Sequence, residues 1–215
     1  MKYGLIGSNG RMGKEIIDVF SDNELVLQMD KDIFEETSVP EVIIDFSLPE
    51  VTDKVIELVR EKKASLVIGT TGLSEIQIEK LKILSKKVAV VQSFNFSQGI
   101  NILKMILRDY SKFLKNWDCE ISEIHHNKKL DSPSGTAILL RNEIIHKNVV
   151  SHSMRIGGVP GDHSIVFANE GEVLQFKHRA ISRKVFALGA LKAAQFVLDK
   201  KNGFYTFEEV IKWMH

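Results

Sequence analysis

Short apolar runs alternate with amphipathic segments along the first part of the chain. The runs predict buried strands at residues 3–8, 25–29, 41–46, 65–69 and 88–92. Between them, apolar residues recur at helical spacing from Arg11, at 49–62 and at 75–86. Strands that alternate with helices in this way favour an α/β fold with a doubly wound, Rossmann-like parallel sheet.

The pattern changes after residue 97. An amphipathic helix is predicted at 100–114, an alternating strand at 117–124, a helix at 134–147, and short strands at 164–168 and 173–178. This grouping favours a second, α+β domain with a mixed or antiparallel sheet. Helical patterns at 185–198 and 207–214 are expected to pack back on the first domain. The predicted domains are therefore 1–97 with 180–215, and 98–179.

Composition narrows the possible partners and compartments. With 29 Lys and Arg against 28 Asp and Glu, the net charge of +1 argues against a nucleic-acid or membrane-surface partner. The single cysteine, Cys119, excludes an intramolecular disulfide, and its alternation with apolar residues in WDCEISEI predicts a buried strand position. No apolar run approaches the ~18 residues of a membrane helix, and no cleavable signal pattern opens the chain, so a cytoplasmic protein is expected.

Glycines mark the connection between the first strand and the first helix. Gly7, Gly10 and Gly13 have the spacing GxxGxxG, a variant of the dinucleotide-binding fingerprint. Asp30 ends the second predicted strand about 20 residues beyond the central glycine, where an acid binds the ribose hydroxyls. Lys31 could pair with a 2′-phosphate or be an ordinary loop cation, so NADH and NADPH both stay open.

Small and polar residues follow the later strands of the first domain. They form the segments 45–47, 69–72 (GTTG) and 93–97 (SFNFS). In open α/β sheets the carboxyl ends of the strands bind ligands, so these segments are candidates for the nicotinamide end of a cofactor. GTTG could equally be a tight turn of the kind that glycine marks.

Residues 123–137, EIHHNKKLDSPSGTA, concentrate titratable groups directly before a predicted helix. Asp131, Ser132 and Ser134 can cap the helix, and Pro133 is expected where its missing N–H costs least. Gly135 would let an anion approach the unpaired N–H groups of the helix start. The adjacent histidines point to opposite faces of a strand, so no shared metal is expected. The alternative interpretation is a plain helix cap beside solvated lysines.

Five motifs together resemble one known family. They are GSNGRMG, GTTG, FNFS, EIHHNKKLDSPSGTA and HRAISRKVFALGAL. The last of them ends at residue 191, and they follow one another in the same order as in the family. The resemblance is to 4-hydroxy-tetrahydrodipicolinate reductase (dihydrodipicolinate reductase), the bacterial lysine and diaminopimelate pathway enzyme. It implies NAD(P)H-dependent reduction of a small dicarboxylate, a second domain for substrate binding and oligomerisation, and a homotetramer.

The resemblance also implies roles for individual residues. His125 corresponds to the proton donor and acceptor and Lys129 to a second proton donor, while Lys128 is a solvated neighbour. The substrate contacts correspond to His126, Gly135 and Thr136. The residues that correspond to the cofactor site are Gly7, Ser8, Asn9, Gly10, Arg11, Met12, Asp30, Lys31, Gly69, Thr70, Thr71, Ser93, Phe94, Asn95 and Phe96. No metal is implied.

The sequence departs from the family pattern without losing a catalytic group. Ser132 stands where alanine is usual, Asn127 stands where arginine is frequent, and the chain is shorter between 147 and 173. Two alternatives stay open. An aspartate-type dehydrogenase would share the glycine loop but would not need the 123–137 motif. A non-enzymatic NAD(P)H sensor would have no need of His125 and Lys129.

Overall fold

The computed structural model describes residues 1–146 and 148–214 and divides the chain into two compact units. One unit is Met1–Phe96 with the C-terminal segment that starts at Lys184, and the other is Ser97–Arg183. The sequence had placed these divisions at 97 and 179. Among the helices of the described residues, none combines the length and the apolarity needed to cross a membrane.

The first unit is built on a seven-stranded sheet of order β11-β6-β5-β4-β1-β2-β3. Its strands are β1 (Lys2–Ile6), β2 (Glu24–Asp30), β3 (Ile33–Glu36), β4 (Val42–Asp45), β5 (Ser65–Ile68), β6 (Ala89–Gln92) and β11 (Gly203–Thr206). Neighbouring strands are parallel, except that β3 runs antiparallel to β2. The parallel Rossmann-like sheet is thus confirmed, but the sequence analysis missed β3 and β11.

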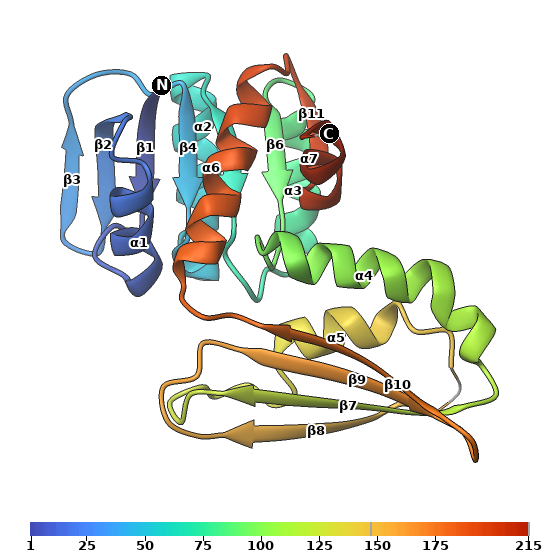
Figure 1. The fold of residues 1–215 in the computed structure, drawn as a ribbon. Helices are drawn as coiled ribbons and strands as arrows, with labels where there is room; N and C mark the ends of the chain where they lie inside the picture. Colours follow the sequence, from blue (N-terminus) through green and yellow to red (C-terminus); the bar gives the residue numbers. More distant parts are fainter. Residues whose placement is uncertain (147, 215) are drawn as a thin grey trace. The chain divides into compact units, whose positions relative to one another are not determined.

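Helices cover both faces of this sheet. They are α1 (Arg11–Val19), α2 (Thr52–Lys62, after a 3-10 turn at Pro49–Val51), α3 (Glu75–Ser85), α6 (Lys184–Leu198) and α7 (Phe207–Trp213). Figure 1 shows α1 and α6 on one face and α2 and α3 on the other. A Cβ on Gly189 of α6 would lie 1.9 Å from the carbonyl oxygen of Phe96, so only glycine allows this close approach. The C-terminal helices α6 and α7 therefore belong to the first unit.

The second unit has a four-stranded sheet of order β10-β9-β7-β8, with α4 and α5 on one face (Figure 1). Its elements are α4 (Gln98–Tyr110, followed by a 3-10 turn at Ser111–Leu114), β7 (Asp118–His125), α5 (Gly135–Asn142), β8 (Val150–Arg155), β9 (Asp162–Ala168) and β10 (Val173–Arg179). The sheet is mixed, because β8 runs parallel to β7 while β7, β9 and β10 pair antiparallel.

The core of the second unit lies between this sheet and its two helices. Cys119 is one of its buried members, and burial raises the pKa of the thiol to about 11, as expected for a packing residue. One prediction was wrong here, and one strand had not been predicted. The helix predicted at 134–147 ends at Asn142, and Lys147 lies outside the described residues. The sequence analysis missed β8, whose six residues, VSHSMR, are mostly polar.

Candidate active site

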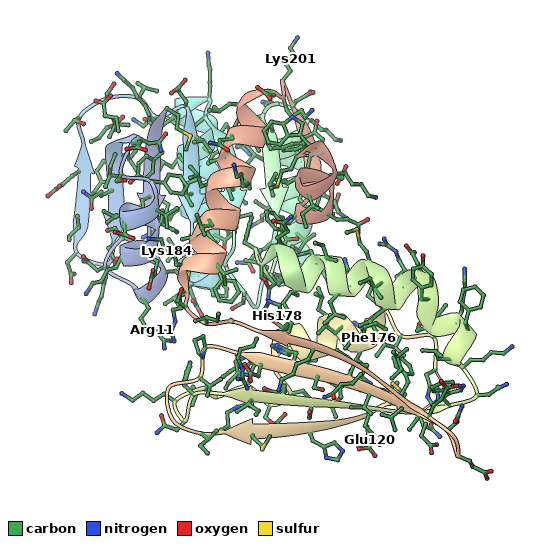
Figure 2. The ribbon with its side chains drawn as sticks, in the orientation of Figure 1. Arg11, Glu120, Phe176, His178, Lys184 and Lys201 are labelled. Atoms are coloured by element: carbon green, nitrogen blue, oxygen red, sulfur yellow. The ribbon has the colours of Figure 1, made fainter. Side chains whose placement is uncertain are left out.

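The glycine loop between β1 and α1 is shaped for close backbone contact. Gly7 has a φ of +80°, and a Cβ on Gly13 would lie 2.3 Å from the carbonyl oxygen of Gly7. Gly10 is the N-cap of α1, and no described side chain caps this helix start. Figure 2 labels Arg11, the first residue of the helix. Amide groups at an uncapped helix start are suited to a diphosphate, so the loop fits a dinucleotide.

Asp30 lies beside this loop, at the end of β2. Its carboxylate accepts hydrogen bonds from the backbone N–H of Asn9 at 2.9 Å and of Lys31 at 2.8 Å. The Asp30 side chain is partly exposed and Lys31 is exposed. The structure therefore brings the predicted ribose-binding acid and the glycine loop together, and Lys31 directly follows the acid.

The GTTG segment after β5 is held by a buried carboxylate. Asp45 is 0% exposed and accepts a hydrogen bond from the Thr70 hydroxyl at 3.0 Å and two from Ser47. Burial raises the pKa of Asp45. The hydroxyl of Thr70 thus stabilises the fold, and Thr71, which is exposed, is the member of the pair whose side chain can meet a cofactor. Gly69 lies against the ring of Phe46, which would clash with any Cβ.

The segment after β6 contributes fewer side chains than predicted. Phe96 is 1% exposed and packs against Phe46 and Phe207, with ring centroids 5.5 and 5.0 Å away. Its side chain is therefore part of the core and not a cofactor contact. The Ser93 hydroxyl donates to the Asn95 carbonyl at 2.8 Å and closes a turn. Phe94 is 43% exposed and remains a candidate contact. Ser8, in the glycine loop, is likewise buried.

Glu123 and His125 are the centre of the second unit's polar cluster. Alternate residues of a strand face the same side, so both point from β7 toward the buried side of the sheet. Nδ1 of His125 is hydrogen-bonded to Oε2 of Glu123, which is 0% exposed. Arg155 of β8 forms a bidentate pair with the same carboxylate at 2.9 and 2.7 Å. The backbone N–H of Ser134 donates to Oε1 at 3.2 Å.

These contacts set the charges of the cluster. Burial raises the pKa of Glu123, but hydrogen bonds from Arg155, Ser153 and His125 outweigh it and lower the pKa to about 2. Burial lowers the pKa of His125, and the Glu123 carboxylate opposes this shift. Glu123 is therefore ionised near neutral pH, and His125 is a titratable group held beside it.

In the loop after β7, Asp131 connects Lys129 to the start of α5. Nζ of Lys129 lies 2.8 Å from Oδ1 of Asp131, and Oδ2 of Asp131 accepts a hydrogen bond from the N–H of Gly135 at 3.3 Å. The Asp131 carboxylate thus contacts both Lys129, the residue that corresponds to the second proton donor, and Gly135, one of the expected substrate contacts. His126 is half-buried and donates its backbone N–H to the carbonyl of Val159 at 2.8 Å.

The start of α5 differs in detail from the prediction. Ser134 is the N-cap, and its hydroxyl accepts from the N–H of Ala137 at 3.1 Å. Pro133 precedes this cap and follows a cis peptide bond, so it does not lie in the first turn of the helix, where its missing N–H was expected to cost least. A Cβ on Gly135 would meet no described atom within 4 Å, so there is open space beside this residue. Thr136 follows, half-buried, in the first turn.

Sequence reasoning missed three members of this cluster: Glu123, Arg155 and His163. Nε2 of His163, from β9, lies 3.2 Å from the Ser134 hydroxyl, and its ring meets that of His125 edge-on at 5.1 Å. Burial lowers the pKa of His163 to about 3, so this ring is neutral. Only Glu123 carried a sequence signal, its spacing of two from His125. In the part of the chain that the structure describes, no cluster of His, Cys, Asp or Glu is arranged to hold a metal ion.

Comparison with known proteins identifies the family. The family model for dihydrodipicolinate reductase, N-terminus, matches residues 24–96, and that for its C-terminus matches residues 99–211. A 4-hydroxy-tetrahydrodipicolinate reductase of Thermosipho africanus is 56% identical over 214 residues, which cover 99% of this chain and 98% of the relative. This chain belongs to the dihydrodipicolinate reductase family. A member from Clostridium novyi is 38% identical, with 98% of each chain covered.

Solved structures agree on the fold. A dipicolinate-bound dihydrodipicolinate reductase from Paenisporosarcina sp. TG-14 superposes with a TM-score of 0.77 at 24% identity, over 96% of this chain and 97% of that one. An aspartate dehydrogenase from Thermotoga maritima reaches a TM-score of 0.55 at 16% identity, over 95% and 99%. Because the fold is common to both enzymes, the family assignment depends on the sequence matches and not on the fold.

Proposed function

We propose that this chain reduces 4-hydroxy-tetrahydrodipicolinate to tetrahydrodipicolinate with NADH or NADPH, in lysine and diaminopimelate biosynthesis. The observation that supports this most is the 56% identity, over 99% of the chain, to a relative named for that substrate. The glycine loop and the Lys129–Gly135 segment support it independently, because they suit a dinucleotide and a small dicarboxylate.

The first unit would hold the cofactor. Amides of the loop Gly7–Met12 would bind its diphosphate and Asp30 its adenosine ribose, while backbone groups at 69–71 and 93–96 and the exposed side chains among them would line the nicotinamide. When bound, the nicotinamide supplies the hydride.

The second unit would bind the substrate and move the proton. Lys129 would bind one carboxylate as a charge-assisted partner, with His126 and the helix-start groups of Gly135 and Thr136. Asp131 now contacts both Lys129 and the N–H of Gly135, so a bound carboxylate would displace or share it. His125 would donate the proton that balances the hydride, since histidine titrates in the right range.

The activity is tested by following NADH or NADPH oxidation with freshly generated 4-hydroxy-tetrahydrodipicolinate. Oxidation that depends on this substrate is expected, and L-aspartate with NAD(P)⁺ serves as the competing assay. A folded protein that does not reduce the substrate, or that oxidises aspartate instead, would contradict the proposal.

Lys129→Ala should raise the KM for the substrate by about 10-fold or more and also lower kcat, because a charge-assisted contact contributes about 1.5–3 kcal/mol. Lys128→Ala is the matched control. Lys128 is the adjacent lysine, is exposed, and is assigned no contact, so its variant should keep the wild-type constants. An unchanged KM in Lys129→Ala would remove Lys129 from the binding site.

The assembly and compartment belong to the same proposal. The family resemblance supports a homotetramer, and the single buried cysteine suits the reducing cytoplasm. Light scattering on the purified protein should give about four times the 24.3 kDa of one chain. A monomeric mass at assay concentrations would contradict the tetramer.

A further inference from the structure

We propose that Glu123 is a positioning residue for His125: its carboxylate, fixed by Arg155, accepts the Nδ1 proton and leaves Nε2 as the atom that holds and releases the catalytic proton. The inference rests on the proposed role of His125 as the acid.

The carboxylate of Glu123 is fully engaged. Oε2 accepts from His125 Nδ1 and from Arg155 Nη1, and Oε1 accepts from Arg155 Nη2 and from the N–H of Ser134. Arg155 is itself held by the carbonyls of Met154 and Asp131 at 2.8 and 2.6 Å. A carboxylate with this many partners cannot rotate, so it fixes the plane of the imidazole ring.

The same contact decides the tautomer of His125. An ionised carboxylate has no proton to donate, so the hydrogen shared with His125 must be on Nδ1. In the neutral ring the lone pair is then on Nε2. A Cβ on residue 161 would lie 3.0 Å from this nitrogen, and the residue there is Gly161. The basic nitrogen therefore faces a backbone position that has no side chain.

Charged and titratable groups face His125 from every neighbouring element. Glu123 comes from β7, Arg155 from β8, Lys129 from the loop after β7, and His163 from β9. Burial, Lys129 and Arg155 lower the pKa of His125, and Glu123 is the group that raises it. Because the His163 ring is neutral, the carboxylate is what keeps an acid available as the pH rises toward neutrality.

The same contacts are also compatible with a purely structural role for Glu123. The pair of Glu123 and Arg155 links β7 to β8, and the contact with Ser134 links both strands to α5. If this were all, loss of the carboxylate would weaken the fold and leave the proton chemistry of His125 unchanged. The two roles therefore differ in the titration of His125.

The kinetic test is Glu123→Gln, with Glu143→Gln as the matched control. Glu143 pairs with Lys104 at 3.4 Å in the same unit, and both side chains are 20% exposed. In Glu123→Gln we expect kcat to fall by about 10-fold or more, with KM changed by less than about twofold. The alkaline limb of the kcat profile should move to lower pH, because His125 loses its proton earlier without the carboxylate. Glu143→Gln should have the kcat, the KM and the kcat–pH profile of the wild type.

A second measurement does not use activity. Imidazole ¹⁵N shifts of His125, assigned with His125→Gln, should show the Nδ1–H tautomer in the wild type and a lower pKa with a mixed tautomer in Glu123→Gln. If that variant does not fold, Glu123→Asp serves, since it keeps a charge for Arg155 but withdraws the carboxylate from Nδ1. Wild-type shifts and an unmoved kcat profile in either variant would overturn the proposal.

The outcomes also separate this proposal from the proposed function. The expected ¹⁵N change in a protein that does not reduce the substrate would reject the proposed reaction and confirm that Glu123 sets the tautomer. Normal reduction of the substrate by the wild type, with ¹⁵N shifts of His125 that do not change in Glu123→Gln, would confirm the proposed reaction and reject the positioning role of Glu123.

Discussion

Replacement of His125 by glutamine should lower kcat by about 100-fold or more, the usual scale for losing a general acid. Glutamine fills a similar space and can still hydrogen-bond to Glu123, but it has no group that titrates near neutral pH. Since His126, Lys129 and the start of α5 would be unchanged, the KM for the substrate should change far less than kcat. Steady-state kinetics with both NADH and NADPH measure the two constants.

His152→Gln provides the control for this variant. His152 is on β8, its side chain is 55% exposed, and it pairs with Glu120 at 3.0 Å, so it is another histidine bound to a glutamate of β7. Its variant should retain wild-type kcat. A His125→Gln enzyme with kcat within about twofold of the wild type would show that another group supplies the proton.

Removal of Arg155 should give the largest loss of stability. Arg155→Ala leaves the carboxylate of Glu123, which is 0% exposed, without its cationic partner. Breaking a buried ion pair from one side costs about 3–5 kcal/mol in the free energy of unfolding. Urea denaturation followed by Trp117 fluorescence, in a Trp213→Phe background, would report on the unit that contains the pair.

The loss of stability in Arg155→Ala should depend on pH. In the wild type the pKa of Glu123 is about 2, below its ordinary value of 4.5, so its stabilisation is present above pH 4.5 and is lost as the pH falls toward 2. Arg155→Ala removes the largest of the contacts that lower this pKa, so the pKa of Glu123 should rise. The difference between variant and wild type should therefore be largest near pH 7 and shrink below pH 4.5 as Glu123 becomes protonated.

Arg141→Ala is the control for charge removal. Arg141 is an exposed arginine of α5, and its variant should change the free energy of unfolding by less than about 0.5 kcal/mol. An Arg155→Ala protein that loses less than about 1 kcal/mol, with no pH dependence, would mean that water enters and solvates the carboxylate.

The central strands could be predicted from the sequence and three edge strands could not. Strands such as β4 and β5 are buried almost throughout, so a continuous apolar run identifies them. The missed strands β3, β8 and β11 are all at sheet edges, where one side has no partner strand. None of their residues is fully buried, so they lack the continuous apolar run on which the prediction of the central strands depends.

The loops and the helix start that form the site could be predicted from the sequence, but the directions of several side chains could not. The glycine spacing, Asp30, His125 and Lys129 all lie in segments that the sequence singled out. The sequence could not tell that the Thr70 hydroxyl binds Asp45 or that Phe96 packs in the core, because neither residue type shows which way its side chain points. Arg155 was beyond reach for a simpler reason: its strand was not predicted.

The parallel register of β7 and β8 bears on how this family can change length. His125 and Arg155 are register partners at the carboxyl ends of their strands, while β8 begins at Val150, opposite Glu120, at the other end. The alignment with the Clostridium novyi relative extends over 247 residues, against 215 in this chain. Residues inserted before Val150 would enter the sheet at the end remote from the histidine. Evolution could thus lengthen or trim that connection while the arginine keeps its place.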